Sequence, residues 1–246
     1  MAIIPFFKRY GETLDRMLNR FRKEQSFYTE SKITYAGRLD PMAEGTMLLL
    51  TDEDVHAKDD YLKLDKVYQV EFILGAMTDS YDILGEITSY ADAFDIPIAK
   101  VEESIANSVG QHEQNYPPFS SKTVSGKPLW QWSREGSIDE IVLPSQEIEV
   151  KEAQYLGFNS YSEDNLSTRI QTSLSLVHGD FRQEETSMAW QQFFREHSGR
   201  YRVFEASFHV SSGTYIRSLI HDIGQQLGVG AVCLKITRKR VGEYEV

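Results

Sequence analysis

The chain has 246 residues, of which 41% are hydrophobic and 26% charged, the balance of a globular protein with a full core. No apolar stretch approaches the ~18 residues of a membrane span, a signal-peptide layout is absent, and the lone Cys233 excludes an internal disulfide, so we expect a cytoplasmic protein. The net charge of −11 by itself argues against a nucleic-acid partner, but the charge is unevenly distributed along the chain. Residues 1–38 carry eight Lys and Arg against four Asp and Glu, and residues 195–246 carry eight against five. Such basic ends form either a local basic face or ordinary solvated surface.

Hydrophobic spacing predicts the first elements. Apolar residues at i, i+3, i+4 and i+7 predict an amphipathic helix over 12–24. The run 46–51 predicts a buried strand, and the alternation over 66–75 predicts another, with Tyr68 on its apolar face. Residues 97–110 are typical of a helix that ends at Gly110.

The second half continues the mixed pattern. Three prolines indicate a loop over 115–130, whereas the polar residues 160–185 favour no particular element. Aromatic residues from Trp190 to His197 share a helical face, and 201–210 alternates as a strand. A helix then begins near Tyr215 and Arg217 and closes at Gly228. The sum predicts an α+β fold with a largely antiparallel sheet.

The stretch "GRLDPMAEG" presents a carboxylate in a restricted loop. Pro41 biases Asp40 away from helical conformations, and Gly37 and Gly45 permit sharp turns on both sides. Such a carboxylate serves as a nucleophile, a general base or a metal ligand, or simply sits in a turn. The absence of a second carboxylate within three residues weakens the metal and glycosidase alternatives.

Two further stretches add candidate residues. A Tyr68 ring can stack on a base and an Arg217 guanidinium can grip a carboxylate, although core packing and a solvated helix start are the plainer alternatives. Phosphate-binding loops, dinucleotide fingerprints and zinc motifs are absent. The acids of 78–86 are spaced wrongly for calcium, which favours a turn for Asp79 and Asp82.

Four blocks in order resemble the TruB family, the tRNA pseudouridine-55 synthases. They are "TYAGRLDPMAEG", "DKVYQVEFILGAMTDSYDILGEI", "YPPFSSKTVSGKPLW" and "SSGTYIRSLIHDIGQQLGVGA". The resemblance implies a pseudouridine synthase fold with a central mixed sheet, flanking helices and an RNA-binding cleft, acting on the T-arm of tRNA without metal or cofactor, as a monomer. The reaction would convert uridine to its C-glycoside isomer.

The resemblance also implies roles for single residues. Asp40 would be the nucleophile, Tyr68 the residue that stacks on the target base, and Arg217 the partner of Asp40. The remaining expected contacts to substrate or RNA are Tyr35, Arg38, Lys127, Tyr215, Ile236 and Arg238, with Arg238 on RNA phosphates.

Three departures from the family pattern stand out. "PFFKRYGETLDR" replaces the N-terminal Lys-Pro loop, Tyr35 stands where the family has a His, and 1–246 is expected to be a single catalytic domain without the C-terminal PUA-type module. These departures leave a non-catalytic tRNA-binding and folding module as the alternative. A glycoside hydrolase and a purely structural protein are weaker alternatives.

Overall fold

The computed structural model describes residues 3–246, and its strands form mainly one sheet. The strands are β1 (Ile3–Lys8), β2 (Ile33–Ala36), β3 (Ala43–Thr51), β4 (Lys66–Leu74), β5 (Ala76–Thr78), β6 (Ile87–Tyr90), β7 (Gly110–Asn115), β8 (Thr123–Val124), β9 (Lys127–Pro128), β10 (Ser145–Ser162), β11 (Arg200–Val210), β12 (Ala231–Val241) and β13 (Tyr244–Glu245). The α-helices are α1 (Leu14–Glu24), α2 (Lys58–Leu62), α3 (Ile98–Ala106), α4 (Leu129–Arg134), α5 (Glu163–Ser175), α6 (Gln183–Glu196) and α7 (Ile216–Gln226).

The main sheet follows the order β1-β3-β12-β4-β11-β10-β7, with β2 added beside β3 and β13 beside β12. The pairing of β12 with β3 is parallel, and every other pair within residues 3–246 is antiparallel. Two short hairpins, β5–β6 and β8–β9, lie outside this sheet. The predicted α+β class with a mixed, largely antiparallel sheet is confirmed.

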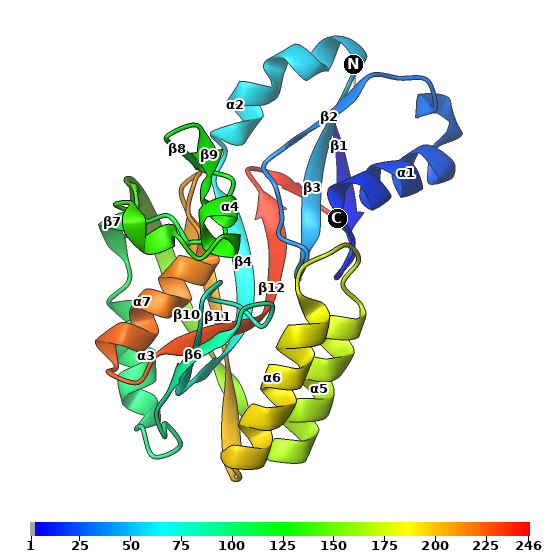
Figure 1. Cartoon of the computed structure of the whole chain (residues 1–246). Coiled ribbons are helices and arrows are strands. Elements are labelled where there is room, and N and C mark those ends of the chain that lie inside the picture. Colours follow the sequence, from blue (N-terminus) through cyan, green and yellow to red (C-terminus); the bar gives the residue numbers. More distant parts are fainter. Residues whose placement is uncertain (1–2) are drawn as a thin grey trace.

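Helices pack around the sheet in distinct groups (Figure 1). α7 packs against β12, α3 packs against β10, and α5 and α6 form a hairpin that also contacts the far ends of β10 and β11. Buried and partly exposed residues alternate along the first part of β4, and Tyr68, Val70 and Phe72 are buried on one face of the strand. No helix among residues 3–246 is long and apolar enough to cross a bilayer.

Several predicted elements are confirmed, and their ends show where long-range contacts act. The first helix, the 66–75 and 201–210 strands and the helix closed by Gly228 are present. The 97–110 prediction was too long, because α3 ends at Ala106 and Gly110 already begins strand β7. Most of the unassigned 160–185 stretch belongs to the α5–α6 hairpin.

Gly45 differs from its expected role as a turn residue. It lies inside β3 with φ +117°, opposite Arg238 of β12. A Cβ at this position would come within 2.2 Å of the Arg238 carbonyl oxygen. Gly45 therefore permits the close approach of two parallel backbones.

Candidate active site

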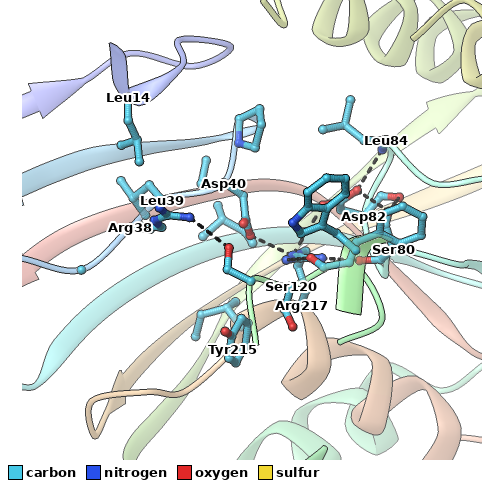
Figure 2. Close-up of a pocket in the computed structure, with 18 of the residues that line it drawn as sticks. Leu14, Arg38, Leu39, Asp40, Ser80, Asp82, Leu84, Ser120, Tyr215 and Arg217 are labelled. Carbon is cyan, nitrogen blue, oxygen red and sulfur yellow. Dashed lines mark hydrogen bonds and ion pairs between the residues drawn. The ribbon is translucent and has the colours of Figure 1, made fainter. Parts of the chain in front are cut away.

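A cleft of about 910 Å³ opens over β4 and β12. Its walls come from the loop 37–41, the turn 80–84, the segment 116–121 and the start of α7 (Figure 2). Segments far apart in the chain therefore meet here, and Figure 2 shows the Arg217 guanidinium between Asp40 and Asp82.

Lys8 holds the backbone of the loop that carries Asp40. The Nζ of the fully buried Lys8, at the end of β1, donates hydrogen bonds to the carbonyl oxygens of Ala43 (2.6 Å), Asp40 (3.0 Å) and Pro41 (3.3 Å). Burial lowers the pKa of Lys8 to about 8, although nearby carboxylates oppose the shift. Lys8 lies in the stretch that replaces the family's Lys-Pro loop, and the sequence alone indicates no role for it.

Arg238 braces the other side of the same loop. Its buried guanidinium donates to the carbonyl oxygens of Thr46 (2.7 Å), Arg38 (3.2 Å) and Gly37 (3.1 Å). We had expected Arg238 to contact RNA phosphates. The side chain is 1% exposed and donates to protein backbone instead, so the structure contradicts that expectation.

Arg217 forms an ion pair with Asp40. Its Nε lies 2.8 Å from Asp40 Oδ2, and the remaining guanidinium nitrogens donate to Ser80 O (2.6 Å) and Phe119 O (3.1 Å). The Arg217 side chain is 3% exposed, whereas Asp40 is 40% exposed and faces the cleft. Burial alone would lower the pKa of Arg217, but the carboxylates of Asp40 and Asp82 outweigh burial and raise it. The guanidinium is therefore a permanent cation beside Asp40.

Asp82 is a second carboxylate that sequence reasoning assigned only to a turn. Its Oδ2 lies 3.6 Å from Arg217 Nε, while Oδ1 accepts hydrogen bonds from Ser80 Oγ (2.6 Å) and Leu84 N (2.9 Å). Burial raises the pKa of Asp82 to about 6, and Arg217 opposes the rise. The acidic turn in the second motif block could have identified Asp82 as a site residue. The ion pair with Arg217 could not be predicted, because the two residues lie far apart in the sequence.

Tyr68, Ile236 and Tyr215 line the cleft beside Asp40. Tyr68 on β4 and Ile236 on β12 are 8% and 3% exposed. Tyr215 caps α7, and the buried Gln114 side chain binds both its N–H (2.8 Å) and its carbonyl oxygen (3.1 Å). Burial raises the pKa of the Tyr215 hydroxyl, so it is neutral. Tyr68, Ile236 and Tyr215 therefore form an apolar and aromatic wall beside the Asp40 carboxylate.

The remaining predicted residues fall into two groups. Tyr35 and Arg38 line the cleft, with the Arg38 guanidinium donating to Ser121 Oγ at 3.0 Å. Lys127 is outside the lining, and its ammonium pairs with Glu135 and lies 3.5 Å from the centre of the Trp132 ring. Within residues 3–246, no cluster of three or more His, Cys, Asp or Glu side chains is arranged to hold a metal ion.

Comparisons with known proteins show which family the chain resembles. The family model of the TruB family pseudouridylate synthase N-terminal domain matches residues 25–175. The tRNA pseudouridine synthase B of Fusobacterium nucleatum is 30% identical over 92% of the chain and 63% of its own length, and that of Thermotoga maritima is 27% identical over 100% and 64%. The chain thus spans somewhat under two thirds of the length of these relatives.

Solved structures show the same fold. A crystal structure of a Cbf5-Nop10-Gar1 complex contains a chain that superposes with a TM-score of 0.58 at 20% identity, covering 99% of this chain and 49% of that one. A crystal structure of an archaeal box H/ACA sRNP Nop10-Cbf5 complex gives a TM-score of 0.55 at 18% identity, covering 99% and 48%. Fold, motifs and family match lead to one conclusion: the chain belongs to the TruB family of pseudouridylate synthases.

Proposed function

We propose that this chain converts uridine to pseudouridine in RNA, with uridine-55 in the T-loop of tRNA as the target, acting as a monomer in the cytoplasm. The observation that carries the proposal is the ion pair between Asp40 and the buried Arg217, with Asp40 facing a cleft walled by Tyr68. The names of the curated relatives, tRNA pseudouridine synthase B, support the substrate class.

The cleft suits a nucleotide that has left its stack. A volume of about 910 Å³ lies in the range of about 300–1,000 Å³ typical of ligand pockets. Flipping a base out of folded RNA costs a few kcal/mol. An aromatic platform such as the Tyr68 ring returns about 1–3 kcal/mol of stacking.

The reaction breaks the N1–C1′ bond, rotates the uracil and forms the C5–C1′ bond. C5 loses its proton and N1 gains one, so the isomerisation conserves atoms and electrons without a co-reactant. Asp40 must be ionised for this chemistry, and its Oδ2 forms an ion pair with the Arg217 cation. Lys8 and Arg238 hold the loop backbone on both sides of Asp40. A loop fixed in this way presents the carboxylate in one position, which favours a near-attack geometry.

The decisive experiment replaces Asp40 with Asn. Asp40→Asn keeps the shape of the side chain but removes its nucleophilic and basic character, so pseudouridine formation on a tRNA transcript should disappear while RNA affinity is largely retained. The matched control is Asp164→Asn, which removes an exposed carboxylate from α5, away from the cleft, and should leave the rate unchanged. Pseudouridine is measured by single-nucleotide chemical mapping. Product formation by Asp40→Asn at the wild-type rate would overturn the proposal.

A further inference from the structure

The α5–α6 hairpin interrupts a pair of strands that is otherwise complete. β10 and β11 pair up to Ser162 and Arg200, and the N–H of Glu163 donates to the carbonyl oxygen of Gly199 at 3.2 Å. A short turn could join the strands at that point. The chain instead makes two helices that pack together and return to the same place (Figure 1). The extra helices therefore need a reason beyond connecting β10 to β11.

The connector between the two helices, residues 176–182, reaches the rim of the cleft. The N–H of His178 donates to Gly11 O at 2.9 Å, and Asp180 forms an ion pair with Arg134 at 2.9 Å. Asp180, Phe181 and Arg182 all line the cleft. The connector thus joins the N-terminal segment and α4 at one end of the site.

Arg182 makes the most extensive contacts of the connector. Its Nη1 donates to Asp79 Oδ2 (2.9 Å) and Glu86 Oε1 (3.1 Å), and its Nη2 donates to Asp79 Oδ1 (3.1 Å). The guanidinium also lies 4.4 Å from the centre of the Phe119 ring. Arg182 adopts a left-handed backbone with φ +62°, a conformation that non-glycine residues rarely keep unless surrounding contacts enforce it.

Two residues on one face of α6 make further hydrogen bonds to the turn 79–86. Thr186 and Trp190 follow Arg182 at intervals of four residues, and both are fully buried. Thr186 Oγ1 donates to Leu84 O at 3.2 Å, and Trp190 Nε1 donates to Ile83 O at 3.0 Å. A single helical stripe therefore binds the whole turn 79–86.

The turn held by this stripe is the one that holds Arg217. Ser80 O accepts from Arg217, and Asp82 lies 3.6 Å from Arg217 Nε. Phe119, which stacks under Arg182, accepts from Arg217 through its carbonyl oxygen. Arg182 thus contacts both protein segments that receive hydrogen bonds from Arg217 behind Asp40.

We propose that the α5–α6 hairpin is a positioning element for the Asp40–Arg217 pair, with Arg182 as its principal positioning residue. This inference rests on the proposed function for its catalytic consequence. Arg182 is engaged by two carboxylates and an aromatic ring, so its part is to fix the turn 79–86 and Phe119 and not to bind RNA phosphate. A loss of this bracing shifts Arg217 and slows the chemical step, while RNA binding is preserved.

The test compares Arg182→Gln with Arg195→Gln. Arg195 lies exposed on the same helix, so its replacement removes the same charge without touching the turn. Single-turnover pseudouridine formation by Arg182→Gln should fall by roughly 10- to 100-fold, because a misplacement of about 1 Å costs on that order. The Kd for the tRNA and its salt dependence should match those of Arg195→Gln. An unchanged rate, or a loss confined to Kd with a shallower salt dependence, overturns the inference and assigns Arg182 to RNA.

Two further measurements separate positioning from simple destabilisation. Thr186→Val and Trp190→Phe each delete one donor to the turn. Each should cost about 1–3 kcal/mol of stability, because a carbonyl oxygen loses its partner, and each should lower the rate at a temperature where the variant is still fully folded. Combining Arg182→Gln with Arg217→Lys should be far from additive, since Arg182 acts through Arg217. Additive losses would contradict the proposed route.

Hydrogen exchange provides a readout that does not depend on activity. Amides of residues 79–86 should exchange faster in Arg182→Gln than in Arg195→Gln. Equal exchange in the two variants would overturn the inference even if the protein showed no synthase activity. A wild-type protein inactive on every RNA would, by contrast, refute the proposed function alone, and faster exchange would still support the bracing of the turn.

Discussion

At the scale of single residues, the proposed chemistry depends on the Asp40 carboxylate, which is paired with a buried cation and carried by a loop that is braced on both sides. Asp40 is 40% exposed, whereas Arg217 and Asp82 behind it are almost fully buried. A buried cation between two carboxylates has few alternative arrangements, because an unpaired charge in this environment would cost several kcal/mol. The pair is therefore held on the side away from the cleft, and Asp40 is exposed toward the cleft.

Replacing Arg217 with Lys tests whether the three hydrogen bonds of the guanidinium are needed. A lysine ammonium retains the charge but cannot reach Asp40, Ser80 and Phe119 at the same time. The loss of one hydrogen bond to a charged group is worth about 1.5–3 kcal/mol, so the single-turnover rate should fall by roughly 10- to 150-fold. Parallel measurements of Kd should show little change. Equal losses of rate and affinity would instead indicate that Arg217 contacts RNA phosphates.

Asp82 predicts a particular pH dependence of stability. Its pKa is raised to about 6 from the usual 3.8. Below pH 3.8 folded and unfolded chains both carry the proton, and between these values only the folded chain retains it. The contribution of Asp82 to the free energy of unfolding is therefore full below the lower value and is lost as the pH rises through about 6.

Asp82→Asn removes that titration. Urea unfolding from pH 3.5 to 7 should show wild-type stability declining relative to the variant, by about 1.4 kcal/mol for each unit of pKa difference. The exposed Asp164 on α5 supplies the control, since Asp164→Asn should follow the wild-type curve. If the stability of Asp82→Asn changed with pH in the same way as that of wild type, the Asp82 carboxyl would not titrate between pH 3.5 and 7.

At the scale of elements, the close pairing of β3 with β12 positions the loop that carries Asp40. Gly45→Ala should destabilise the protein, because the new Cβ would lie 2.2 Å from the backbone oxygen of Arg238, which cannot move aside as a side chain would. Gly110 is the matched control, with φ +123° and no atom within 4 Å of its added Cβ.

Both glycine substitutions carry a backbone strain of about 1–3 kcal/mol. Gly45→Ala should cost about 1–3 kcal/mol more, the usual penalty of overpacking, and should also slow pseudouridine formation. The measurement is chemical unfolding of both variants alongside single-turnover rates. Similar stabilities for the two variants would mean that β3 and β12 separate without penalty.

At the scale of the whole molecule, the sheet brings the two basic ends of the chain together. Only β3 separates β1 from β12. Part of the positive charge counted in the sequence is internal, however, because Lys8, Arg217 and Arg238 are buried and bind protein groups. The remaining exposed cations, such as Arg38 at the cleft, contribute less charge than the sequence count suggests.

Recognition of folded RNA should involve Tyr35, which lines the cleft from β2 with the Lys58 ammonium 5.6 Å from its ring centre. If Tyr35 fills the place of the flipped base, Tyr35→Ala should lose about 1–3 kcal/mol, the value of one base–aromatic stack. The loss should appear in single-turnover rates on a tRNA stem-loop and shrink on an unstructured oligonucleotide. Equal slowing on both substrates would show that Tyr35 plays no special part in flipping.

The sequence by itself determined the features that depend on local chemistry. Periodicity located α1, β4, β11 and α7, because burial of one face leaves a repeat of 3.6 or 2 in the chain. The Asp-Pro loop was readable since Pro41 restricts Asp40 directly. The order of the four motif blocks by itself indicates the family.

Only the tertiary structure decided how these pieces support one another. Arg217 meets Asp40 across 177 residues of chain, and Lys8 and Arg238 hold the same loop from opposite ends of the sequence. The spacing of these residues in the sequence does not predict the contacts, because each contact depends on the order of strands in the sheet and on which buried donors need acceptors. The α5–α6 hairpin shows the same limit: its polar sequence resembled no element, and its grip on the turn 79–86 exists only once the helices have packed.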